Sequence, residues 1–147
     1  MIDHLCVSLH CNVQEVLDII SDGLFEGILI SMNPQNYDKW QPVLKAAKEK
    51  NIGIATMNTL GGGLVPRYPQ LFKMLDETDD SAVIKALNFM RSFEELDVCI
   101  SGMSNKAQID ENCVAFNDDP RGTYIKTAAK RDFAMPVTQK LCSGCNY

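Results

Sequence analysis

The sequence has little positive charge and no long apolar run. Its 14 lysines and arginines are outnumbered by 19 aspartates and glutamates, which gives a net charge of −5 at pH 7. That balance leaves no basic patch for a nucleic-acid backbone, so we expect no nucleic-acid partner. No apolar run reaches the length of a membrane span, and the opening Met-Ile-Asp-His lacks the charged-then-apolar pattern of a secretory signal. We therefore expect a cytoplasmic protein with no membrane partner.

The six cysteines do not indicate a disulfide framework, because no secretory signal accompanies them. Cys6, Cys99 and Cys113 each lie in an apolar pattern, which predicts that they are small core residues. Only Cys142 and Cys145 form a close pair.

Strand and helix patterns alternate four times before residue 117. Short apolar runs predict strands over 5–9, 27–32, 52–57 and 98–100. Apolar residues at helical spacing predict helices over 13–20, over 43–50 with Pro42 in the first turn, over 81–93, and after Asn105. Such alternation is typical of an α/β fold with a parallel sheet and right-handed crossovers. The pattern decays afterwards, so we divide the chain into 1–117 and an irregular C-terminal tail, 118–147.

The fourth strand ends at Ser101-Gly102, and a helix follows almost at once. Asn105 and Gln108, three places apart, predict an N-cap pair at its start. A helix in this position directs its free N–H groups and positive dipole end at the carboxyl edge of the sheet, which suits a phosphate. The apolar residues that share one face of this helix are Ile109, Cys113 and Phe116.

A loop with three consecutive glycines, Gly61 to Gly63, follows the third strand. Glycines allow a close backbone approach to a ligand, but composition alone gives equal weight to a flexible surface loop. His10 follows the first strand, where a ligand contact and a bonded turn histidine are both open. Tyr37 and Trp40, three places apart, favour packing. The acidic run 76–80 lacks the ligand spacing of a calcium loop and is expected to be a solvated turn.

Four segments, in this order and spacing, resemble the aldo/keto reductase family: Ser31-Met32-Asn33-Pro34, Met57-Asn58-Thr59-Leu60-Gly61-Gly62-Gly63, Ser101-Gly102-Met103-Ser104-Asn105 and Ile109-Asp110-Glu111-Asn112. The closing Leu141-Cys142-Ser143-Gly144-Cys145-Asn146-Tyr147 resembles the branch of that family with a cysteine-rich, ferredoxin-like tail. The family is a TIM, or (β/α)8, barrel. Its fifth to eighth units align with this chain, so the resemblance implies a half-barrel of four parallel βα units.

The resemblance also implies a nicotinamide cofactor, NAD(P), at the carboxyl ends of the strands. Ser8 matches a contact to the nicotinamide carboxamide, and Met57 stands where an aromatic residue often stacks under the ring. The matches to the pyrophosphate loop are Leu60, Gly61 and Gly62. The matches to the adenosine phosphate pocket are Gly102, Met103 and Gln108, and those to the adenine site are Glu111 and Asn112.

The chain also departs from the family pattern. Leu29 stands where a glutamine often binds the carboxamide, and Met57 replaces an aromatic residue. Gly102, Met103 and Gln108 replace the basic and hydroxyl groups that usually hold a 2′-phosphate, which weakens the case for a strong NADP preference. No residue matches the family's catalytic aspartate, tyrosine, lysine and histidine, which come from the first four strands. We therefore expect no catalytic residue in this chain.

Cys142 and Cys145 match the start of a run of four iron–sulfur ligands in the resembling branch. Two thiolates do not complete a cluster or a structural zinc site, so an iron–sulfur cluster requires further ligands, for example across a dimer. A redox dithiol is the alternative for this pair.

Three function classes stay open at this stage. The first is the cofactor-binding half of an NAD(P)H-dependent carbonyl reductase, inactive without its missing half. The second is a non-catalytic half-barrel that self-associates or pairs with a separate N-terminal half-barrel chain, because a sheet cut from a barrel has two open edges. The third is a metal or redox fragment built on Cys142 and Cys145. A relic without function is compatible with the same sequence.

Overall fold

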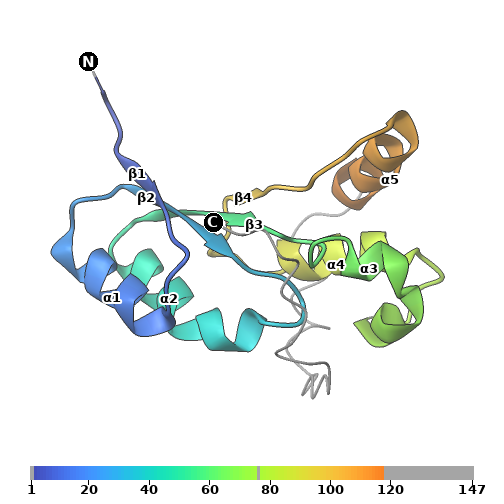
Figure 1. Ribbon diagram of the computed structural model, residues 1–147, viewed down its shortest axis with the longest axis horizontal. Coiled ribbons are helices and arrows are strands. Elements are labelled where there is room, and N and C mark those ends of the chain that lie inside the picture. The colour runs from blue at the N-terminus through green and yellow to red at the C-terminus, as the bar shows by residue number, and fades with distance from the viewer. Residues whose placement is uncertain (1, 76, 118–147) are drawn as a thin grey trace.

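The computed structural model describes residues 2–75 and 77–117 of the chain (Figure 1). The tail 118–147, including Cys142 and Cys145, lies outside the described residues. The elements in chain order are β1 (Cys6–Ser8), α1 (Val13–Asp22), β2 (Gly27–Ser31), α2 (Tyr37–Glu49), β3 (Gly53–Met57), α3 (Leu64–Arg67), the 3-10 helix η1 (Pro69–Leu75), α4 (Ala82–Arg91), β4 (Val98–Cys99) and α5 (Lys106–Asn117).

The four strands form one parallel sheet in the order β1-β2-β3-β4. Each strand therefore pairs with its neighbour in sequence, and Ile28 of β2 pairs with Val7 on one side and Ile54 on the other. Parallel pairing requires a crossover between strands, which the helices supply. The predicted α/β class and parallel sheet are confirmed.

The core lies between one face of the sheet and the helices. Ile28, Ile30 and Ile54 point to this face and are at most 2% exposed. In Figure 1, α1 and α2 lie together on one side of the sheet. The helical residues that join this core include Val16, Ile20, Val43, Leu44, Ala47, Ala86, Leu87 and Met90. Side chains alternate along a strand, so only every second strand residue enters this core.

Among residues 2–75 and 77–117, no helix covers the other face of the sheet. Cys6, Ser8 and Val98 on that face are exposed, and Leu29 and Ala55 are half-buried. A groove of about 520 Å³ runs over it and is lined by residues of all four strands. Parallel sheets are normally covered on both faces, so this one-sided coverage is unusual. The name open face is used below for eight residues of this surface: Cys6, Ser8, Leu29, Ser31, Ala55, Met57, Val98 and Ile100.

Local capping sets the ends of α1 and the start of α4. The Asn12 side chain accepts from the Glu15 N–H at 3.1 Å, and the Glu15 carboxylate accepts from the Asn12 N–H at 2.9 Å, which forms a capping box on α1. Gly23 ends α1 with a left-handed φ of 70°. Ser81 caps α4 by accepting from the Ile84 N–H at 3.3 Å.

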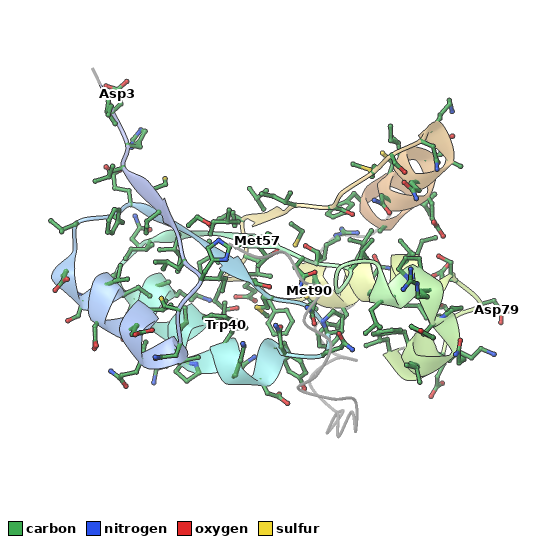
Figure 2. All side chains as sticks on the ribbon, in the orientation of Figure 1. Asp3, Trp40, Met57, Asp79 and Met90 are labelled. Carbon is green, nitrogen blue, oxygen red and sulfur yellow. The ribbon has the colours of Figure 1, made fainter. Side chains whose placement is uncertain are left out.

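Helix α2 begins at Tyr37, so the prediction that it starts with Pro42 in its first turn was wrong. The reason is tertiary packing. The indole N–H of Trp40 donates to the Ser31 carbonyl at 2.9 Å, and Trp40 is 3% exposed between α2 and the sheet (Figure 2). The Tyr37 ring packs edge-on against Phe89 with centroids 5.0 Å apart. These contacts outweigh the missing N–H of an internal proline, and they confirm the packing role of Tyr37 and Trp40.

The expected burial of three cysteines was largely wrong. Cys6 and Cys113 are exposed, and Cys99 is half-buried. Cys6 lies on the open face of the sheet. Because no described helix packs on that face, an apolar residue there stays exposed.

Helix α5 likewise buries a different face from the expected one. It buries Asn112 and Ala115 and leaves Ile109 and Phe116 about half exposed. The Arg91 guanidinium of α4 donates to the Ala115 carbonyl and lies 5.2 Å from the Phe116 ring. Contact with α4 therefore sets the rotation of α5.

Replacing Trp40 by alanine should lower the free energy of unfolding by about 3–5 kcal/mol, because the cavity between α2 and β2 cannot fully collapse. Urea unfolding followed by circular dichroism measures the change. Lys45→Ala is the control on the same helix, since its side chain is 81% exposed, and it should stay within about 0.5 kcal/mol of the wild type. Equal losses for the two variants would contradict the burial of Trp40.

Candidate functional site

A cleft of about 410 Å³ lies at the carboxyl edge of β3 and β4. Three segments far apart in the sequence line it: the loop after β3, the residues after β4, and one face of α5. Pro66 of α3 and Val83 of α4 also line it. The other lining residues are Asn58, Thr59, Leu60, Gly62, Gly63, Ile100, Ser101, Gly102, Gln108, Glu111 and Asn112.

The glycine loop adopts a backbone that other residues avoid. Asn58 has a φ of 59°, and Gly61, Gly62 and Gly63 have φ values of 63°, 63° and 87°. A Cβ on Gly61 would lie 3.1 Å from the Gln35 amide oxygen. The Gly61 N–H donates to the Asn58 carbonyl at 2.8 Å, which folds the loop into a turn. The glycines therefore determine the shape of one wall of the cleft.

Buried hydrogen bonds join this loop to its neighbours. The Thr59 hydroxyl, on a residue that is 1% exposed, donates to the Ile100 carbonyl at 2.8 Å. On the other side, the buried Asn33 amide donates to the Asn58 carbonyl at 3.3 Å. The loops after β2, β3 and β4 are thus connected through Thr59 and Asn33.

The wall formed by α5 carries three polar side chains of the cleft, those of Gln108, Glu111 and Asn112. The Asn112 amide donates to the Ser101 hydroxyl at 3.1 Å, and Asn112 is 7% exposed. The Ser81 hydroxyl donates to Glu111 Oε1 at 2.6 Å, so the carboxylate is held from α4. The side chains of Glu111 and Asn112 therefore each have a protein partner that orients them.

The first turn of α5 is capped largely as the sequence indicates. The Gln108 N–H donates to the Asn105 side chain at 3.0 Å, which confirms Asn105 as the N-cap. The Gln108 side chain, however, accepts from the Ser104 N–H at 2.7 Å instead of closing on Asn105. That contact holds the segment between β4 and α5 against the helix.

The structure brings six of the ten residues matched to the cofactor into the cleft: Leu60, Gly62, Gly102, Gln108, Glu111 and Asn112. Gly61 belongs to the same loop but does not line the cleft. Met103 lines a separate pocket of about 270 Å³ beside α5, together with Ile109 and Phe116.

Ser8 and Met57 lie outside the cleft, on the open face. Ser8 ends β1, and its hydroxyl is 3.2 Å from His10 Nε2. Met57 pairs with Ser31 at the end of β3 and directly precedes the glycine loop. Residues matched to the two ends of the cofactor therefore occupy two places at the carboxyl edge: the open face and the cleft.

Sequence reasoning missed several lining residues and the short helix α3. Thr59 is adjacent to the glycine loop, but no local pattern shows that it lines the cleft. Ser81 carries an N-cap signal, but no local pattern shows that it donates to Glu111. Val83 reads as an ordinary core position of α4. Only the packing of α4 beside the loop after β3 makes it part of the cleft.

The described residues that line the cleft carry one charge. Among the described residues that line it, Glu111 alone is charged, and none is a lysine or arginine. In residues 2–75 and 77–117, no group of three histidine, cysteine or acidic side chains is placed to hold a metal ion. The iron–sulfur and redox interpretations of Cys142 and Cys145 remain predictions outside the described residues. No helix in the described part of the chain has the length and apolar character needed to cross a membrane.

The chain has no match among protein-family models, curated proteins or solved structures.

Gly61→Ala should destabilise the protein by about 1–2 kcal/mol, because alanine is strained at positive φ. Gly102→Ala, also in the cleft, should have a much smaller effect, since its added Cβ meets nothing within 4 Å. Thermal and urea unfolding of the two variants provide the comparison. Equal stability of both variants and the wild type would mean that the loop relaxes away from this backbone.

Proposed function

We propose that this chain is the cofactor-binding half of an aldo/keto reductase-like (β/α)8 barrel and that it binds NAD(P) at its carboxyl edge. Four parallel strands in sequential order, with the crossover helices α1 and α2 together on one side of the sheet, are an arrangement from which such a barrel is built. Helices cover the outside of a closed barrel, and the other sheet face lines its interior. The open face corresponds to that interior.

The observation that carries the proposal is the cleft after β3 and β4. It gathers six residues matched to the pyrophosphate and adenosine parts of the cofactor from the segments 60–62 and 102–112. Its mixture of surfaces suits a nucleotide: Leu60, Pro66 and Val83 offer apolar contact to a base, and the Asn112 amide and Glu111 carboxylate offer hydrogen bonds. A volume of about 410 Å³ is within the usual range for small-molecule sites.

Carbonyl reduction needs a hydride from the nicotinamide and a proton from a positioned acid. No residue of this chain matches the family's proton donor, so the acid belongs to a first-half barrel segment that closes over the open face. The role of this chain is to bind the cofactor, with Ser8 and Met57 near the nicotinamide end.

Isothermal titration calorimetry with NADH and NADPH tests cofactor binding directly. Saturable binding of at least one of them is expected, and Gly102→Trp should weaken it at least about tenfold by filling the cleft. Space around the Gly102 Cβ allows this variant to fold. Lys45→Trp, on the exposed face of α2, is the matched control and should bind as the wild type does. Absence of binding to both cofactors would refute the proposal.

A second candidate function is non-catalytic assembly, in which two copies close one eight-stranded barrel. The observation that favours it is the open face between β1 and β4, which are the edge strands of the sheet in the described part of the chain. All four strands run in one direction, so a two-fold axis along the strands would place β4 of each copy beside β1 of the other. This arrangement would cover the open face and pair both edges.

Sedimentation velocity distinguishes assembly from a monomer. If two copies close a barrel, Val98→Lys should shift a dimer to a monomer, because Val98 lies on the open face and is 51% exposed. Leu24→Lys is the control, since Leu24 is 67% exposed between α1 and β2 and away from the open face. A wild-type monomer over a broad concentration range would eliminate this candidate.

A further inference from the structure

The pocket of about 270 Å³ beside α5 gathers sulfur-bearing side chains that the proposed function does not use. Cys99, Met103 and Cys113 all line it. The other residues that line this pocket are Leu87, Ser101, Ile109, Asn112 and Phe116. Two thiols and one thioether therefore meet at a small and mainly apolar pocket.

Three different elements of the chain supply these side chains. Cys99 alternates with Val98 along β4, and because Val98 is exposed on the open face, Cys99 points to the helical side of the sheet and packs against the core. Met103 belongs to the segment between β4 and α5. Cys113 lies one turn after Ile109 on α5, and both residues line the pocket. A strand, a connection and a helix thus contribute one sulfur-bearing side chain each.

Sulfur provides the softest donor atoms of this lining. Asn112 and Ser101 bond to each other, since the amide donates to the hydroxyl at 3.1 Å. Among the described residues that line the pocket, none is a histidine, an aspartate or a glutamate. The set of two cysteines and a methionine therefore differs from the histidine, cysteine and carboxylate groups that residues 2–75 and 77–117 lack. Such a set suits a soft metal ion.

The surroundings of the pocket provide a counter-charge and an entry path. The Arg91 guanidinium lies 5.2 Å from the centre of the Phe116 ring, and Phe116 lines the pocket. Two thiolates around a monovalent ion leave one net negative charge, which a nearby cation stabilises. Met103 is 47% exposed and Ile109 is 46% exposed, so the pocket is open to solvent on their side. A metal ion can therefore enter it.

We propose that Cys99, Met103 and Cys113 bind one Cu(I) ion. Thiolate and thioether sulfur are soft ligands that select Cu(I) over hard cations. Structural zinc takes four ligands, whereas this lining offers three sulfur donors, a number that satisfies Cu(I). On binding, each thiol releases its proton to solvent and its sulfur bonds to the ion, while the Met103 thioether binds without losing a proton. The ion stays in the Cu(I) state, so no electron acceptor is needed.

Anaerobic titration of the full chain with Cu(I), in competition with the chromophoric chelator bicinchoninate, tests the site. Cys142 and Cys145 form another close pair in the sequence, so the chain carrying Cys142→Ser and Cys145→Ser is the background for every measurement. This background should bind one equivalent of Cu(I) and show the ultraviolet charge-transfer absorption of Cu(I)–thiolate bonds. Zn²⁺ should bind to it at least about a hundredfold more weakly, because the lining does not supply four ligands.

Single substitutions in that background assign the binding to named residues. Cys99→Ser and Cys113→Ser should each weaken Cu(I) binding at least about a hundredfold, because a hydroxyl is a hard donor. Met103→Leu keeps an apolar side chain of similar size and should weaken binding about tenfold. Cys6→Ser is the matched control, since Cys6 is an exposed cysteine on the open face, and it should bind Cu(I) as the background does. Circular dichroism melting checks that each variant is folded.

The proposal is independent of cofactor binding, so titrations with NADH and NADPH do not bear on it. Failure of the background to bind one equivalent of Cu(I) would overturn it. Unchanged affinity in a folded Cys113→Ser variant would do the same, as would an equal loss in Cys6→Ser, because the ion would then be held by thiols outside the pocket. Zn²⁺ binding as tight as that of Cu(I) would contradict the assignment of the metal.

Discussion

Parallel pairing of each strand with its sequence neighbour is the constraint on which the rest of the structure depends. The order β1-β2-β3-β4 places every carboxyl strand end at one edge of the sheet. Loops that are distant in the sequence therefore meet there, and the cleft forms where the loops after β3 and β4 meet α5. The crossover helices pack on one face of the sheet, and this leaves the other face as the open face.

Buried polar contacts join the loops that line the cleft. Thr59 and Asn33 join the three loops of the carboxyl edge, and Asn112 joins α5 to the segment after β4. A buried polar group without a partner is costly, so these pairs resist rearrangement of the loops. A preorganised cleft of this kind reduces the ordering cost of binding a ligand.

The open face has a different physical character. Its residues are small or apolar, as in Ser8, Ala55 and Val98, and a groove of about 520 Å³ runs across them. A parallel sheet exposed in this way gains stability when another layer covers it. The cleft at the edge and the open face are therefore linked through the same strands, because Met57 lies on the open face and leads into the glycine loop.

The sequence by itself determined the α/β class, the four parallel strands, and the capped starts of α1 and α4. These features depend on local periodicity and on residues within one turn of each other, as with Asn12 and Glu15. Tertiary structure alone decided the start of α2, which Trp40 sets by its bond to Ser31, and the rotation of α5, which contact with α4 sets. It also decided the exposure of Cys6, because an apolar pattern does not reveal which sheet face is covered. The cleft was likewise decided by tertiary structure. Ser81 and Glu111 are 30 residues apart in the sequence, and only the packing of α4 against α5 brings them together.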